Sequence, residues 1–126
     1  MRYKLTIQGR LKTYNDYILA CRGNKYKGAA FKNNEQAICY GYILEQLQRL
    51  KINKRVWIDY HWYEPTRTRD KDNLSSWGRK VIQDALVKAG TLKNDGWSEI
   101  EGFSDYFYVD CDNPRIEIII TEIGDG

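Results

Sequence analysis

Two aspartates separated by a single residue, Asp70 and Asp72, form the clearest chemical pattern in this sequence. Side chains two residues apart in an extended segment point to the same side of the backbone. Paired carboxylates with no His or Cys beside them are hard oxygen ligands that suit Mg²⁺ or Mn²⁺. Such a cation would also relieve the repulsion between the two negative charges. The pair therefore indicates a divalent-metal site where a strand gives way to a helix.

Structural roles compete with this interpretation. Asp72 is well placed as a helix N-cap, since aspartate is common at the start of a helix. Asp95 lies in Asn94-Asp95-Gly96, which is strong turn chemistry. An EF-hand also begins with Asp-x-Asp, but its glycine and its glutamate would fall on Ser75 and Val81 here. The EF-hand is therefore excluded, whereas the capping and turn roles stay open.

Other kinds of catalytic site find little support. The chain has no Walker A, GxGxxG, GxSxG or HExxH motif. His61 is the single histidine and lies in a strand pattern, so we expect a structural role for it. Cys21, Cys39 and Cys111 form no CxxC pair, which favours reduced thiols in a cytoplasmic protein.

The charge is distributed very unevenly along the chain. Residues 1–55 carry twelve Lys or Arg against three acidic residues, a net charge of +9, and residues 91–126 carry a net charge of −7. The whole chain has a net charge of +3. A basic half favours a polyanionic partner such as a nucleic acid, because Lys and Arg that neutralise phosphates release condensed counterions.

The elements that must position these residues follow from the hydrophobic periods. Alternation predicts strands, a period near 3.6 predicts helices, and residues 9–32 show no clear period and read as a long basic loop with tyrosines. The predicted strands are 1–8, 54–63, 103–109 and 115–121, and the predicted helices are 34–51 and 73–89. The last two strands are joined by the polar turn 110–114.

This order, β-α-β-α-β-β, predicts an α+β fold with a mostly antiparallel sheet and two helices. The 126 residues suit a single domain, and no linker or internal repeat divides them. No apolar run approaches the ~20 residues that span a bilayer, and the N-terminal residues do not resemble a signal peptide. We expect a non-membrane protein whose many aromatic residues serve mainly the core and a dimer interface.

The pattern as a whole resembles the RusA family of Holliday-junction resolvases. The resemblance is strongest over residues 67–95, where Arg69-Asp70-Lys71-Asp72-Asn73-Leu74 is followed by Asp84-Ala85-Leu86, Gly90 and Asn94-Asp95. The segment from Pro114-Arg115 and the closing 120–124 are also similar. The resemblance implies a small homodimeric endonuclease, often borne by phages and prophages, that cuts four-way DNA junctions with Mg²⁺ or Mn²⁺ in recombination and repair.

The resemblance also assigns roles to residues. Asp70, Asp72 and Asp95 correspond to the family's metal-binding aspartates, so we expect all three to converge on one cluster. Lys80 keeps the family's spacing to Asp84 and is expected to be the catalytic cation. However, the segment between Leu74 and Lys80 is about one helical turn longer than in the best-known members, so the cationic role is open between Lys80 and Arg79.

The remaining expectations concern supporting and DNA-binding residues. Asp84 should orient Lys80, and Asn73 should support the aspartates. The residues expected to contact DNA phosphates are Arg10, Lys12, Arg22, Lys25, Lys27, Arg67 and Arg69. Tyrosines of the basic loop, such as Tyr14, Tyr17 or Tyr26, could stack on bases at an open junction. Two alternatives remain: a nuclease for other branched DNA, and a DNA-binding dimer without catalysis.

Overall fold

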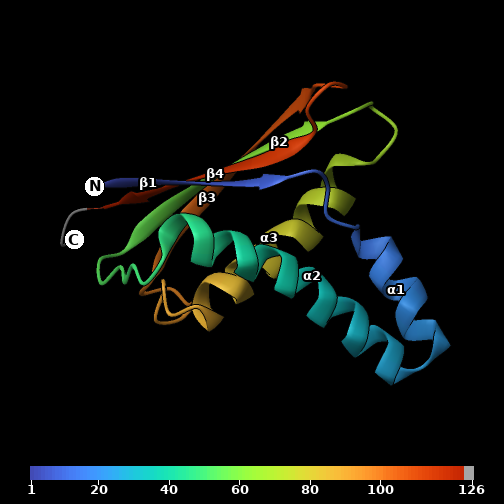
Figure 1. Cartoon of the computed structure of the whole chain (residues 1–126), viewed down its shortest axis with the longest axis horizontal. Helices are drawn as coiled ribbons and strands as arrows, with labels where there is room; N and C mark the ends of the chain where they lie inside the picture. Colours follow the sequence, from blue (N-terminus) through green and yellow to red (C-terminus); the bar gives the residue numbers. More distant parts are fainter. Residues whose placement is uncertain (124–126) are drawn as a thin grey trace.

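A computed structural model of the chain describes residues 1–123. Three helices lie on one side of a four-stranded sheet (Figure 1). The elements in chain order are β1 (Arg2–Gln8), α1 (Tyr14–Gly23), α2 (Lys25–Leu47), β2 (Val56–Glu64), α3 (Lys71–Lys88), β3 (Ile100–Val109) and β4 (Arg115–Glu122). The α+β class is confirmed, with three helices in place of two. Gly124, part of the proposed C-terminal resemblance, lies outside the described residues.

The sheet is mixed, with strand order β1-β4-β2-β3. β4 pairs antiparallel with both β1 and β2, whereas β2 and β3 are parallel. The two last strands are therefore not neighbours, although a short turn joins them, because β2 lies between them. The parallel pair follows from the α3 crossover, since a strand-helix-strand unit returns the second strand in the same direction.

The expectation of a long loop over residues 9–32 is wrong, because this segment holds α1 and the first turns of α2. Thr13 and Asp16 form a capping box: the Thr13 hydroxyl accepts from the Asp16 N–H at 3.3 Å, and the Asp16 carboxylate accepts from the Thr13 N–H at 3.0 Å. Asn24 ends α1 and caps α2 by accepting from the Lys27 N–H at 2.9 Å.

Aromatic packing holds these N-terminal helices against α3. The ring of Tyr17 stacks on the indole of Trp77 with centroids 4.7 Å apart, and Phe31 lies 5.6 Å from the same indole. Trp77 also donates its indole N–H to Glu35 at 3.1 Å, and Glu35 accepts the Lys12 N–H at 2.6 Å. A buried carboxylate with two donors therefore anchors α2 to α3 and to the segment before α1.

The core lies between the sheet and the helices. Alternate residues of β2 (Val56, Ile58, Tyr60 and Trp62) are buried, and the same alternation buries three isoleucines of β4. Among residues 1–123, no helix lies on the other face of the sheet (Figure 1). Within the part of the chain that is described, no helix is long and apolar enough to cross a membrane.

Candidate metal and DNA site

Asp70 and Asp72 lie at the N-terminal end of α3. Asp70 is the N-cap: its carboxylate accepts from the Asn73 N–H at 3.0 Å. Asp72 lies in the first turn, and both aspartates are exposed. The capping role therefore belongs to Asp70 and not to Asp72. The positive end of the helix dipole favours both negative charges at this position.

Asn73 links this helix end to α1. Its side-chain oxygen accepts from the Asn15 N–H at 2.9 Å, which holds the first turn of α1 against the first turn of α3. Asn73 thus fixes the position of the segment that carries the two aspartates.

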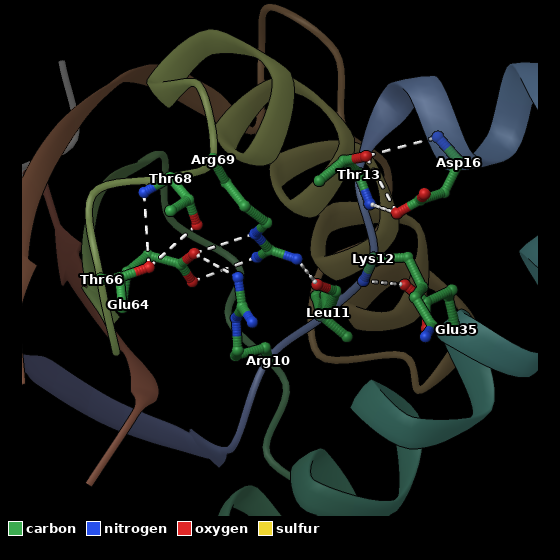
Figure 2. Close-up of polar contacts among 10 residues, drawn as sticks. All are labelled: Arg10, Leu11, Lys12, Thr13, Asp16, Glu35, Glu64, Thr66, Thr68 and Arg69. Carbon is green, nitrogen blue, oxygen red and sulfur yellow. Dashed lines mark hydrogen bonds and ion pairs between the residues drawn. The ribbon is translucent and has the colours of Figure 1, made fainter. Parts of the chain in front are cut away.

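A buried glutamate binds two arginines next to the N-terminal end of α3 (Figure 2). Glu64, at the end of β2, accepts two bonds from the Arg69 guanidinium, at 2.8 and 3.1 Å, and one from Arg10 at 3.0 Å. Arg69 also donates to the Leu11 carbonyl at 2.8 Å. This Arg10–Glu64–Arg69 clamp ties β2, the segment after β1 and the segment before α3 together.

The clamp changes the interpretation of two basic residues. Arg69 directs its guanidinium at Glu64 and Leu11, and its side chain is only 20% exposed. Arg69 therefore shapes the site more than it offers a free charge to phosphate. Arg10 is more exposed, at 35%, but also bonds Glu64. Arg67 is exposed and is the better candidate for a phosphate contact.

A cavity of about 640 Å³ opens beside this helix end. One wall is polar and includes Glu64, Arg67, Asp70 and Lys71. The other is apolar, and its residues come from α3 and the end of β3: Leu74, Phe107, Tyr108 and Val109. The cavity thus joins carboxylates, cations and aromatic surface.

Asp95 lies at the opposite end of α3. It follows the helix in the connection to β3 and lines a separate cavity of about 220 Å³ with Gln83, Ile100 and Phe103. The 18 residues of α3 separate the two ends by ~27 Å. Figure 1 shows the connection before α3 and the connection after it at opposite ends of the helix. Within one chain, the expectation that Asp95 joins Asp70 and Asp72 is therefore wrong.

The Asp95 segment is a local turn, though not a hairpin. The Asn94 side chain accepts from the Asp95 N–H at 2.8 Å, and the Gly96 carbonyl accepts from the Ile100 N–H at 3.0 Å. Residues 1–123 contain no group of three or more His, Cys, Asp or Glu side chains arranged to hold a metal ion. A single chain thus has two of the three expected aspartates at one end of α3 and the third in the connection at the other end.

The segment before Lys80 is helical and does not loop out. Helix α3 is continuous through Gly78, and Lys80 pairs with Asp84 at 3.2 Å. Asp84 also binds Gln36 at 3.2 Å and Lys32 at 3.6 Å, both from α2. The expected pairing of Asp84 with Lys80 is confirmed. Eight residues of helix place Lys80 ~12 Å along the axis from Asp72.

Arg79 faces the sheet instead of the aspartates. Its guanidinium binds the Asp105 carboxylate of β3 and lies 4.7 Å from the ring centroid of Phe103. Asp105 also accepts from the Trp62 indole N–H at 2.9 Å. Arg79 is therefore part of the packing between α3 and the sheet, and its position gives no support to a substitute catalytic role.

The other predicted DNA-binding residues form two groups. Lys12 is exposed on the segment before α1, close to the clamp. Arg22, Lys25 and Lys27 are exposed around the α1–α2 junction, at the far end of the ten-residue α1. The ammonium of Lys25 lies 5.3 Å from the Tyr26 ring centroid. The exposed basic residues thus lie at two places, the segment near the clamp and the α1–α2 junction.

Sequence reasoning missed the importance of Glu64. The alternation of β2 places position 64 on the buried face, where Val, Ile, Tyr and Trp precede it. A carboxylate in a buried register needs cationic partners, and two arginines lie nearby in sequence or space. That register was the signal that could have found it.

The uncovered face of the sheet carries an aromatic stack that was also missed. Tyr63 stacks on Tyr108 at 4.5 Å, Tyr108 on His61 at 5.7 Å, and His61 on Tyr106 at 4.8 Å. The Arg115 guanidinium lies 3.7 Å from the Tyr63 centroid. His61 also shares a 2.9 Å hydrogen bond with the Tyr108 hydroxyl.

No known protein-family profile matches the chain, and no curated protein sequence matches it significantly. A functional assignment therefore depends on the motifs of residues 67–95 and on the geometry around α3.

Proposed function

We propose that this protein is a metal-dependent endodeoxyribonuclease that nicks four-way DNA junctions as a homodimer. The observation that carries the proposal is the position of Asp70 and Asp72, separated by one residue at the positive end of α3, with Asp70 lining the 640 Å³ cavity. The resemblance of residues 67–95 to junction resolvases supports the substrate. A twofold dimer with one site per subunit suits a junction that needs two matched nicks.

The residues around the cavity suit a phosphodiester. Arg67 and Lys71 carry positive charge at its polar wall, where phosphate oxygens of a DNA strand would bind. The N-terminus of α3 adds a favourable potential for the same anion. A Mg²⁺ or Mn²⁺ ion, when bound, would lower the pKa of a water molecule and neutralise charge on the phosphate. The clamp around Glu64 holds these residues in place.

The proposal is tested with a labelled four-way junction, a flap and a linear duplex, each with Mg²⁺, Mn²⁺ or EDTA. We expect paired nicks in the junction that require the cation. Asp72→Asn should reduce nicking at least 100-fold, about 2.7 kcal/mol of barrier, and should keep or strengthen junction binding, because it removes a negative charge that faces phosphate.

Glu45→Gln is the matched control, since Glu45 is an exposed carboxylate of α2 remote from the aspartates in sequence. It should leave nicking unchanged. Equal loss of binding and cleavage in Asp72→Asn would identify Asp72 as a structural residue. Cleavage of the flap in preference to the junction would instead assign a different branched substrate.

A second candidate, a DNA-binding dimer without catalysis, is favoured by the aromatic stack on the open face of the sheet. Exposed aromatic rings on a sheet can stack on unpaired bases. Junction binding that is lost in Tyr106→Ala, with no cation-dependent nicking by the wild type, would favour this candidate.

A further inference from the structure

The apolar wall of the 640 Å³ cavity is more than a phosphate needs. Arg67 and Lys71 line the polar wall, and Leu74, Phe107 and Val109 line the other. A phosphodiester would use the polar wall alone. A whole nucleotide has an anionic phosphate joined to a flat aromatic base, so its two halves match the two walls. The volume of the cavity also lies within the ~300–1,000 Å³ typical of pockets that enclose a small ligand.

The apolar wall is already fixed in the free protein. Leu74 is buried near the start of α3. Phe107 is half-buried and lies beside the buried Trp62 of β2 in the sheet. The end of β3 is tied to β2 by a backbone bond from the Asp110 N–H to the Glu64 carbonyl, at 2.8 Å. A ligand therefore meets a preformed surface, which reduces the entropy cost of binding it.

Lys71 connects the two walls. Its ammonium lies 5.4 Å from the centroid of the Phe107 ring, a cation–π contact. Both residues line the cavity, so a base that stacks on this ring would take the place of the ammonium. The lysine side chain is a point charge on a flexible stem, and it can turn from the ring to the phosphate of the same nucleotide. The contact thus keeps a cation close to the position that the phosphate would occupy.

A base can enter this cavity only after it has left the helical stack. Unstacking a base costs free energy, and the cost is smallest where the base is already unpaired. The branch point is the place where a four-way junction can open, whereas a linear duplex has no such point. A base site next to the aspartates would therefore favour branched DNA over a linear duplex.

We propose that this cavity binds the unstacked base of a nucleotide next to the cleaved phosphate, with the base against Phe107 and the phosphate at Arg67 and Lys71. The inference rests on the proposed nuclease function, and it adds a physical reason for the choice of a branched substrate. Asp70 lines the same cavity, so the bound nucleotide lies at the aspartate end of α3. Stacking alone accepts any base, because every base has an aromatic face.

The first test measures junction affinity in EDTA, for variants with unchanged circular dichroism. Phe107→Leu keeps an apolar side chain but removes the flat ring, and it should weaken binding at least tenfold. Phe107→Tyr keeps the ring and should bind like the wild type. Tyr40→Leu is the matched control, because Tyr40 is also half-buried and its ring lies 5.7 Å from the ammonium of Lys88, in the last turn of α3. Equal affinities for the two leucine variants would overturn the proposal.

The second test identifies the bound base. In a series of junctions, each lacks a single base close to the branch. At one of these positions the wild type and Phe107→Leu should bind with equal affinity, because the ring has lost its ligand. At the other positions the tenfold difference should remain. A difference that persists at every position would show that Phe107 does not stack on a base near the branch, and it would overturn the proposal.

A photochemical crosslink locates the contact on the protein. Light breaks the carbon–iodine bond of 5-iodouracil, and the base carbon then bonds an aromatic carbon that lies against it, with loss of HI. With 5-iodouracil at the position found in the second test, we expect the adduct on Phe107 and its loss in Phe107→Leu. An adduct on Tyr106, which belongs to the aromatic stack on the open face of the sheet, would overturn the proposal.

These measurements separate the base site from the proposed function. A wild type that nicks junctions with Mg²⁺ or Mn²⁺, but whose affinity is the same in Phe107→Leu and Tyr40→Leu, would keep the function and refute the base site. Binding that depends on the Phe107 ring and on one base, by a wild type that nicks no DNA with either cation, would keep the base site and refute the function.

Discussion

Gly78 of α3 lies directly against the indole of Trp62 on β2. A Cβ at position 78 would come within 2.5 Å of the Trp62 ring, and Trp62 is buried and held by Asp105 at 2.9 Å. The indole therefore has little freedom to move aside. The absence of a side chain at position 78 allows α3 to approach the sheet closely, and this contact sets the height of the helix above β2.

Gly78→Ala should destabilise the fold by about 1–2 kcal/mol, because overpacking outweighs the gain of ~1 kcal/mol in helix propensity. Gly41→Ala is the matched control: it lies in α2 with no atom within 4 Å of the added Cβ. That substitution should stabilise the protein by up to ~1 kcal/mol. Urea denaturation of both variants measures the difference, and equal effects would contradict the role of Gly78.

The regular elements with a clean period were predictable from the sequence. The alternation of β2 and β4 and the apolar stripe of α3 gave bounds within a few residues of those observed. Helix α1 was missed because it buries no residue and its aromatic side chains pack sideways on Trp77. Thr13 and Asn24 are typical N-cap residues. Their presence in the sequence could have predicted the starts of α1 and α2.

The sheet order and the position of Asp95 depend on tertiary contacts that no local pattern reports. β4 pairs on both of its sides, so the last strand of the chain is central in the sheet. The separation of Asp95 from Asp72 follows from the length of α3, which the sequence did contain. The resemblance in spacing led us to expect Asp95 close to Asp72 in one chain. The length of α3 instead places the two residues at opposite ends of this helix.

Glu64→Gln should destabilise the protein by about 2–4 kcal/mol. The substitution removes the buried negative charge that Arg10 and Arg69 share, and both guanidinium groups lose their ionic partner. Thermal and urea denaturation measure the effect. Glu45→Gln, the same change at an exposed position, should stay within ~0.5 kcal/mol of the wild type. A loss no larger than that of the control would show that the clamp contributes little to stability.

Glu117 should give the fold a specific acid sensitivity. The Arg115 guanidinium, 2.6 Å away, and Lys4 hold the pKa of Glu117 below its usual value. A carboxylate with a lowered pKa in the folded state contributes stability that is fully present above its unfolded pKa of 4.5 and is lost as the pH falls through the lower folded value.

Glu117→Gln should therefore be less stable than the wild type at pH 7, with a difference that shrinks below about pH 4. Urea denaturation at several pH values measures this convergence. Asp110 bonds the same Arg115, and its pKa is also lowered, so Asp110→Asn should show the same direction. A difference between wild type and Glu117→Gln that is constant across the pH range would contradict this account.

Lys80 and Arg79 are adjacent in sequence but should respond differently to substitution. Arg79 binds Asp105 and packs over Phe103, with its side chain 19% exposed. Its removal leaves a half-buried carboxylate with one partner fewer, so Arg79→Ala should cost about 2 kcal/mol or more of stability. Lys80 is 55% exposed, and its pair with Asp84 is worth ~0.5 kcal/mol at most.

Lys80→Ala should thus leave the melting temperature nearly unchanged and, if Lys80 acts on the phosphate, lower the cleavage rate at least tenfold, about 1.4 kcal/mol of barrier. Junction affinity should change little, because one exposed cation among many is removed. Lys88→Ala, an exposed lysine in the last turn of the same helix, is the control and should leave cleavage intact. Single-turnover cleavage with saturating protein separates the chemical step from binding. Equal rates for Lys80→Ala and Lys88→Ala would remove Lys80 from the reaction, since a cation that touches the reacting phosphate cannot be lost without slowing its cleavage.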